Sequence, residues 1–241
     1  MNAKRKCMAV LTIAILCVIV PVVAVAGDDQ AKEQERVKES GNVMTEIMNS
    51  ASSVPISVLN KSECVIVIPS MKKAGFVVGA EYGRGVMTCR GGEDFTGPWS
   101  APTMMKSGGG SVGLQVGGQS IDLVILVMND KGARAVMNGK AKLGADASVA
   151  AGPVGRDAEA STNAAMSAEM LSYSRTQGAF AGVSLSGATL GPDEGANEQL
   201  YGKKVTAKEI ISGAAGPPPA SAQQLLAVLT EKSPNNASKG K

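Results

Sequence analysis

The chain opens with a continuous apolar run and then changes to a pattern with helical spacing. Residues 7–23 are almost entirely apolar, whereas residues 29–52 are polar on most faces. Within the second segment, apolar residues recur at intervals that place them on one side of a helix, which predicts an amphipathic helix with a narrow apolar stripe. Pro55 ends this helix, because proline cannot continue it. The stripe consists of Val37, Met44, Ile47, Met48 and Ala51.

Strand patterns dominate the next part of the chain. Residues 64–68 are uninterrupted apolar and mostly β-branched, which is typical of a central strand buried on both faces. Glycines are dense between Gly75 and Gly118 and favour turns, bulges and tightly curved strands over helices. Tyr82 and Gly83 are expected to form a turn between two strands. The expected strands in this region are residues 64–68, 75–81, 84–90, 111–117 and 121–128.

The C-terminal half predicts a mixture of strands and helices. Capping-box patterns at residues 206–209 and 221–224 predict two helix starts, because a Ser or Thr side chain and a Glu or Gln three residues later satisfy free backbone N–H groups. Residues from Ser233 onward are polar and offer no packing face. The other expected elements are a helix at 129–140, a strand at 143–155 and two strands within 170–186.

Together these elements predict an α+β fold, a single domain with a curved, mostly antiparallel β-sheet flanked by N- and C-terminal helices. The chain shows neither an interdomain linker nor an internal repeat, which favours one domain. We expect this domain to span residues 27–232 and to be followed by a disordered tail at residues 233–241.

Composition excludes several classes of enzyme. The 241 residues are 44% hydrophobic and include no histidine. Histidine is the commonest general base and the commonest metal ligand, so its absence excludes hydrolases of the Ser-His-Asp and Cys-His kinds and zinc sites with histidine ligands. No cofactor is expected.

The N-terminus has the features of a secretory signal peptide. Lys4, Arg5 and Lys6 precede the apolar run, and small residues at Ala24 and Ala26 fit a cleavage site after residue 26. The alternative is an uncleaved membrane anchor, because the run is nearly long enough to span a bilayer. Residues 1–26 contain three of the 24 basic residues and none of the 21 acidic ones, so the mature chain has 21 of each. Its neutrality gives no argument for nucleic acid binding.

Export determines how the cysteines are interpreted. After removal of residues 1–26, only Cys64 and Cys89 remain. Two cysteines in an oxidising compartment predict a disulfide, here one that joins two strands of one sheet. The alternative is a pair of buried free thiols.

Two segments match the sequence motifs of catalytic sites but lack the structural context that those motifs require. Residues 109–113 fit the nucleophile elbow G-x-S-x-G, but a strand follows them and no histidine exists. Ser70 and Lys73 fit S-x-x-K, although the companion boxes are absent and Gly75 interrupts the required helix. A Ser-Lys hydrolase therefore remains a remote alternative. Asp122 is interpreted as a structural carboxylate that pairs with a basic group. No acidic cluster has the spacing of a metal site.

Many short motifs in this sequence resemble, in order, those of the SYLF domain family. The resemblance covers residues 34–229, nearly the whole mature chain. The matching positions are Pro69, Lys73-Ala74-Gly75-Phe76, Gly79, Gly83-Arg84-Gly85, Trp99-Ser100-Ala101-Pro102, Gly109-Gly110-Ser111-Val112-Gly113-Leu114-Gln115-Val116-Gly117, Asp122, Leu143-Gly144-Ala145-Asp146, Gly152-Pro153-Val154-Gly155-Arg156, Tyr173-Ser174-Arg175, Gly178-Ala179-Phe180-Ala181-Gly182-Val183-Ser184-Leu185 and Tyr201-Gly202.

The resemblance implies a non-enzymatic module that binds membrane phospholipid. In eukaryotic members the ligands are phosphoinositides, and some fungal members bind actin. For an exported chain we expect a phospholipid or membrane surface as the partner, and neither actin nor nucleic acid. The expected location is the periplasm or the cell envelope. The alternative is a structural envelope protein that makes protein contacts only.

Two surface sites are expected for a lipid. Basic residues beside the strands at 75–90 predict a rim for an anionic head group, which we call the basic rim. It consists of Lys72, Lys73, Arg84 and Arg90. Alternating small side chains predict a groove for an acyl chain, although close packing is the commoner outcome for such residues. This groove is expected at Ala147, Val149, Ala181 and Val183.

Overall fold

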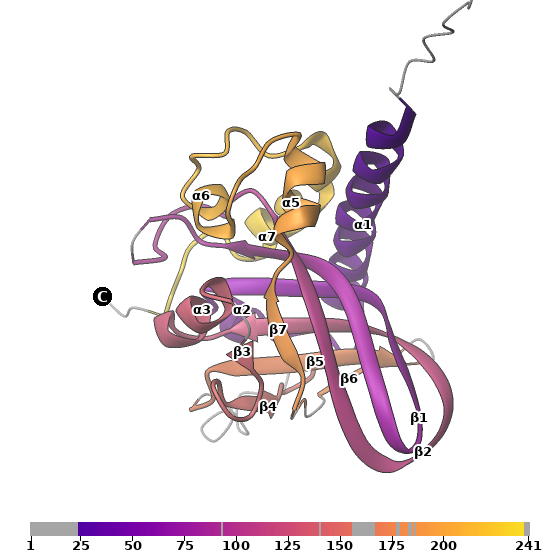
Figure 1. Ribbon diagram of the computed structural model, residues 1–241. Helices are drawn as coiled ribbons and strands as arrows, with labels where there is room; N and C mark the ends of the chain where they lie inside the picture. Colours follow the sequence, from indigo (N-terminus) through magenta and orange to yellow (C-terminus); the bar gives the residue numbers. More distant parts are fainter. Residues whose placement is uncertain are drawn as a thin grey trace, which may run out of the picture.

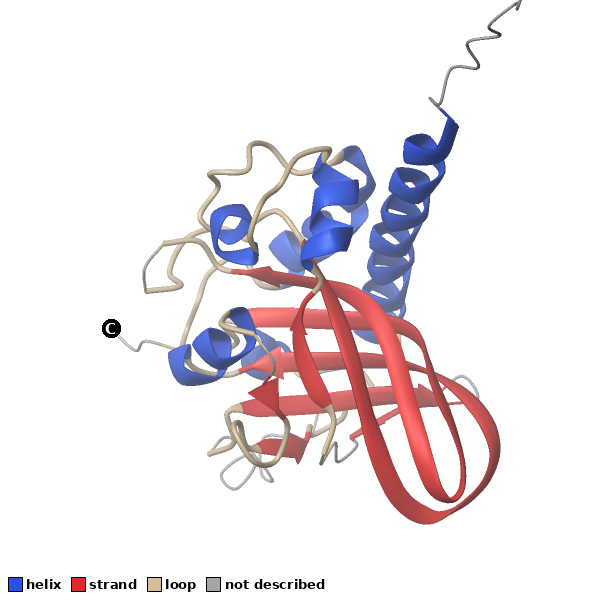
Figure 2. Ribbon diagram, in the orientation of Figure 1, coloured by secondary structure: helices blue, strands red, loops and turns tan. Residues whose placement is uncertain are grey.

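The computed structural model describes residues 24–92, 94–139, 141–155, 167–176, 179–182, 185 and 187–238. A layer of helices covers one side of a strongly curled sheet, and the long helix α1 (Ala24–Asn49) runs along the edge of both (Figures 1 and 2). The predicted α+β class with helices at both ends of the chain is confirmed. Within the described ranges, no helix combines the length and the apolar character needed to cross a membrane.

Two very long strands form the centre of the sheet. β1 (Cys64–Cys89) and β2 (Thr103–Val127) pair antiparallel along almost their whole length. The predicted turn at Tyr82 and Gly83 is wrong, since these residues lie inside β1 and pair with Gly108 and Ser107. The glycines that suggested separate strands instead allow one ribbon to bend.

The β1–β2 ribbon bends back on itself, as the lower right of Figure 1 shows. Its register shifts between Ile68 and Met71 and again after Phe76, and such irregularities increase bending. The bend brings the second half of β1 against the first half. At Gly85 a Cβ atom would overlap the backbone carbonyl of Val67, so this crossing requires glycine.

Shorter strands extend the sheet from β2, along the edge opposite β1, with β7 near the start of β2 and β5 near its end. β5 (Met170–Thr176) pairs antiparallel with β2 and with β6 (Ala179–Gly182), which confirms the two strands predicted within residues 170–186. β4 (Val149–Ala151) adds to β5 in parallel. β7 (Thr189–Pro192) pairs with β2 and with β3 (Ala141–Lys142).

The helix starts follow local capping chemistry in part. Thr206 and Glu209 form the predicted capping box at the start of α6 (Ala207–Ile211). The second predicted box is wrong, because Ser221 lies within the 3-10 turn η2 (Ala220–Ala222) that leads into α7. The remaining helices are α2 (Ile56–Leu59), α3 (Asp130–Met137), α5 (Glu194–Tyr201) and α7 (Gln223–Lys232).

The apolar side chains form two main cores. In the first, Val37, Met44 and Ile47 of α1 pack with α7 and with the sheet face that carries Val65 and Val67. The predicted stripe of α1 therefore faces the protein, except for exposed Ala51. The second core lies within the curled sheet and is closed by α3.

The C-terminal tail, which the sequence predicts to be disordered, makes specific contacts within its described residues, 233–238. Ser233 is fully buried, and the residues after it hydrogen-bond to the loop that follows β1 and to the α2–β1 junction. The expectation of disorder rested on the lack of apolar residues. Polar side chains and backbone groups anchor this segment instead.

Candidate functional site

A disulfide joins Cys64 to Cys89, the first and last residues of β1. The expected bridge between two strands is thus a bridge between two ends of one strand, because the curl of β1 brings its ends together. Next to the disulfide, the Arg90 N–H donates to the Glu63 carbonyl at 2.8 Å. Cys64 and Cys89 are both buried. We call the meeting of residues 63–64 with residues 89–90 the β1 seam.

Of the four residues of the predicted basic rim, only Lys72 is exposed. Lys72 is exposed, and its Nζ lies 3.0 Å from the Ser120 hydroxyl. Lys73 is less exposed and forms an ion pair with Glu81, with 3.1 Å between Nζ and Oε2. Of these two lysines, Lys72 is the one without a carboxylate partner among the described residues.

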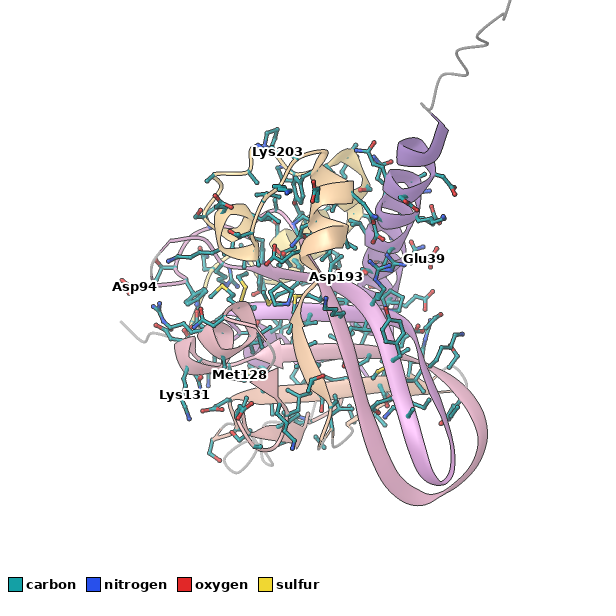
Figure 3. All side chains as sticks on the ribbon, viewed as in Figure 1. Glu39, Asp94, Met128, Lys131, Asp193 and Lys203 are labelled. Carbon is teal, nitrogen blue, oxygen red and sulfur yellow. A yellow bond between two sulfur atoms is a disulfide. The ribbon has the colours of Figure 1, made fainter. Side chains whose placement is uncertain are left out.

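Arg84 does not belong to a rim. Its Nη2 lies 2.9 Å from Asp193 Oδ2 and 3.2 Å from Glu33 Oε1. Asp193 precedes α5 where the sheet meets the helical layer (Figure 3), and the buried Glu33 on α1 also pairs with Arg36. Arg84 thus joins sheet and helices, because a buried carboxylate needs a charged or hydrogen-bonding partner.

Arg90 is fully buried, so its assignment to the basic rim is also wrong. Its guanidinium lies over the Trp99 ring, 4.2 Å from the centroid, and its Nη2 donates to Ser233 Oγ at 2.6 Å. Burial lowers the pKa of Arg90, and the nearby Glu63 carboxylate opposes this shift. The curl of β1 carries this arginine into the seam, which residue spacing alone could not reveal.

The predicted acyl groove is not formed by the residues that the structure describes. Ala147 is buried in the second core and Val149 packs against it, whereas Ala181 is exposed. Val183 lies outside the described residues. Close packing of Ala147 explains the difference, since an unfilled apolar groove costs stability.

The residues that suggested catalysis have structural roles. Asp122 accepts from Arg175 Nη2 at 2.5 Å and from the Ser70 N–H at 2.9 Å, which confirms the interpretation of Asp122 as a paired carboxylate. Ser70 and Lys73 lie on a strand, not on the helix that S-x-x-K requires, and Lys73 is paired with Glu81. Within the described ranges, no cluster of acidic or cysteine side chains could hold a metal ion.

The strongest candidate site is a cavity of about 1090 Å³ where α1 ends and α2 begins, which we call the α2 cavity. It is formed by the end of α1, the start of α2, the loop after β4 and the end of α7. Cavities near this size are typical of small-molecule sites. Its lining residues are Met48, Asn49, Ser50, Ala51, Ser53, Val54, Pro55, Ile56, Ser57, Val154, Gly155 and Lys232.

Backbone geometry brings two of these walls together. Gly155 adopts a φ of 86° and its N–H donates to the Ser53 carbonyl at 3.1 Å. Three residues earlier, Gly152 lies so close to the buried Tyr173 ring that a Cβ atom would overlap it. These two glycines hold the loop with Val154 beside the end of α1.

The lining of the cavity combines exposed apolar side chains, polar side chains and one lysine. Ile56 is 43% exposed and Val154 is 40% exposed, and both line the cavity. Among the described lining residues Lys232 is the only charged one, and its Nζ lies 2.8 Å from Glu231 on the protein surface. Such a site suits an amphiphile with an anionic group.

Sequence reasoning did not identify Ile56, Val154 or Lys232 as site residues. Signals existed for the first two. Ile56 follows Pro55 at a helix start, and Val154 lies between Pro153 and a glycine in a turn-forming segment, so both apolar residues belong to segments that run over a protein surface. Lys232 gave no such signal.

Residues 108–232 match the model of the Ysc84 family, described as "Las17-binding protein actin regulator". An SH3 domain-containing protein of Schizosaccharomyces pombe is 37% identical over 205 residues, which cover 81% of this chain and 46% of that protein. LAS seventeen-binding protein 3 of Saccharomyces cerevisiae is 32% identical over 88% of this chain and 46% of its own length.

A human relative, SH3 domain-containing YSC84-like protein 1, is 32% identical over 86% of this chain and 60% of its own length. The chain thus spans about half the length of the curated relatives it matches. No solved structure is significantly similar to it. The family match and the relatives agree with the motifs from Pro69 to Gly202, and the chain belongs to the Ysc84/SYLF family.

Proposed function

We propose that this protein is an exported, non-enzymatic module that binds phospholipid at the surface of the cell envelope. The observation that carries the proposal is the position of Ile56 and Val154, two exposed apolar side chains, on one cavity whose only charged lining residue among those described is Lys232. Phospholipids combine apolar chains with an anionic phosphate. The α2 cavity offers a complementary group for each part.

The expected affinity is modest. Fully burying a valine or isoleucine side chain contributes roughly 1.5–3 kcal/mol. Since Ile56 is 43% and Val154 40% exposed, inserting both into lipid contributes about 2 kcal/mol. A lysine near an anionic surface adds about 1 kcal/mol, and Lys232 contributes less than this because it is paired with the Glu231 carboxylate. The protein is therefore expected to associate weakly and reversibly, and less strongly at high salt.

Vesicle co-sedimentation with Ile56→Asn and Val154→Asn tests this site. With vesicles of phosphatidylglycerol and phosphatidylcholine, each substitution is expected to lower the partition coefficient about fivefold, because each removes about 1 kcal/mol of apolar transfer. The matched control is Tyr82→Asn. Tyr82 is 56% exposed but lines a different cavity, and partitioning of this variant should stay unchanged. An equal loss in all three variants would contradict a role for the α2 cavity.

The disulfide of the β1 seam supports export, because disulfides persist in oxidising compartments. Cleavage after Ala26 would also leave Asp28 and Asp29 in the first turn of α1, where negative charge stabilises a helix. The test is intact mass of the full chain recovered from a secreting host. A chain that begins at Gly27 is expected. Retention of residues 1–26 would support the uncleaved anchor instead.

The second candidate function is binding of a protein partner. The family description and the name of the yeast relative both refer to Las17 binding, and a structural envelope protein would likewise make protein contacts only. Under this alternative, wild-type protein and all three variants should fail to sediment with vesicles. The vesicle assay therefore separates the two candidates.

A further inference from the structure

The C-terminal residues Ser233–Ser238 form a segment that we call the strap. The strap leaves α7 directly after Lys232, which lines the α2 cavity. It then crosses the β1 seam and ends at the residues that connect α2 to β1. None of this was expected from its polar sequence. Two anchors hold it in place.

The first anchor is Arg90. Its Nη2 lies 3.1 Å from the Ser233 carbonyl oxygen and 3.0 Å from the Asn235 carbonyl oxygen. Trp99 donates from its indole N–H to the same Ser233 carbonyl at 3.0 Å. Because Arg90 and Ser233 are fully buried, this contact fixes the position at which the chain leaves α7.

The second anchor lies at the α2–β1 junction. Asn236 Nδ2 donates to Glu63 Oε2 at 2.9 Å, and Ser238 Oγ donates to Glu63 Oε1 at 2.8 Å. The Ala237 N–H donates to the carbonyl of Asn60 at 2.7 Å. Asn60 is the C-cap residue of α2, whose first residue Ile56 lines the cavity.

The strap therefore connects two walls of the same cavity. One wall is the end of α7 with Lys232, and the other is the start of α2 with Ile56. We propose that the strap positions these two walls, so that lipid binding at the α2 cavity depends on docking of the strap at the β1 seam. This inference rests on the proposed function for its ligand, but its structural part is testable without lipid.

A matched pair of substitutions isolates the strap. Asn236→Ala removes the side-chain bonds to Glu63 and to the Phe95 carbonyl, and also the bond that Asn236 Oδ1 accepts from the Ser238 N–H at 2.7 Å. Asn235→Ala is the control, since the Asn235 side chain is exposed and only its backbone carbonyl contacts Arg90 in the described part of the chain. Both changes lie on the surface of a short segment outside the two main cores.

The first measurement is hydrogen exchange in the absence of lipid. In Asn236→Ala, we expect the amides of Ala237 and Asn60 to exchange about tenfold faster than in wild type, because three hydrogen bonds that hold the strap are lost. The Asn60 N–H donates to the Ile56 carbonyl, so its exchange reports on α2. Asn235→Ala should exchange at the wild-type rate. In Asn236→Ala the free energy of unfolding in urea should fall by no more than about 1.4 kcal/mol, the equivalent of a tenfold change, so the protein stays folded. In Asn235→Ala it should stay the same.

The second measurement is the phosphatidylglycerol vesicle partition coefficient, which should fall about fivefold in Asn236→Ala and stay constant in Asn235→Ala. Equal exchange at Asn60 in the two variants overturns the proposal, whether or not the protein binds vesicles. Faster exchange with an unchanged partition coefficient also overturns it, because the walls then move without effect on the ligand. If wild type does not bind vesicles, the proposed function fails, and exchange still decides whether the strap holds α2.

Discussion

Removal of the Cys64–Cys89 disulfide should destabilise the protein by an amount that follows from chain entropy. The two residues are 25 positions apart. In the chain-entropy description, closing a loop of that length in the unfolded chain corresponds to about 3.5 kcal/mol at 25 °C. The variant is the chain of residues 27–241, the expected mature form, with Cys64→Ala and Cys89→Ala, since alanine adds no polar atom to the buried seam.

Unfolding in urea can be followed by fluorescence of Trp99, the single tryptophan of the chain, which is buried against Arg90 beside the seam. The free energy of unfolding is expected to fall by about 3.5 kcal/mol. For a chain of this size the melting temperature should fall by roughly 7–14 °C. Reduction of the wild type should reproduce the effect once the buried disulfide becomes accessible.

The control is treatment of the double-alanine variant with the same reductant, which should change nothing. A loss below about 1 kcal/mol would refute the reasoning, because the bridge would then constrain little of the unfolded chain. Quantitative thiol labelling of the mature wild type without reductant would refute it more directly. That result would mean that the two thiols are free.

Two further predictions concern β1 and the contact between β5 and α3. Gly85→Ala should lower the free energy of unfolding by about 3 kcal/mol, because the added Cβ would overlap the backbone of Val67. The control is Gly118→Ala, which has open space around it and should change the free energy of unfolding by about 1 kcal/mol or less. Both values can be measured by unfolding in urea. Burial tends to raise the pKa of Glu169, but hydrogen bonds from Lys131 and a backbone N–H lower it on balance. The resulting stabilisation is present above the unfolded pKa, about 4.3, and is lost as pH falls through the lower folded-state value. Glu169→Gln should reduce this acid dependence of the urea midpoint, and an unchanged dependence would contradict the assignment.

Local sequence features determined the elements that depend on short-range physics. The helical spacing of Val37, Met44 and Ile47 specified both α1 and the face that it buries. Thr206 and Glu209 specified the start of α6, because a capping box closes within one turn. The two strands expected within residues 170–186 likewise correspond to β5 and β6.

Pairings between distant residues needed the tertiary structure. Spacing placed Arg84 and Arg90 beside strands, but only the bend of β1 decides that Arg84 meets Glu33 and that Arg90 enters the seam beneath the strap. Glycines permit such a bend without specifying its position or direction.

The sequence by itself thus determined the α+β class, the buried face of α1, the capping box of α6 and the pair of cysteines. The fold alone decided the α2 cavity and the strap, since the cavity combines residues from 48 to 232 and the strap is held by residues about 140 or more positions earlier. The physical reason is the distance along the chain over which each interaction acts. Capping and periodicity act within a few residues, whereas a polar segment such as Ser233–Ser238 becomes ordered only when distant donors and acceptors converge on its backbone.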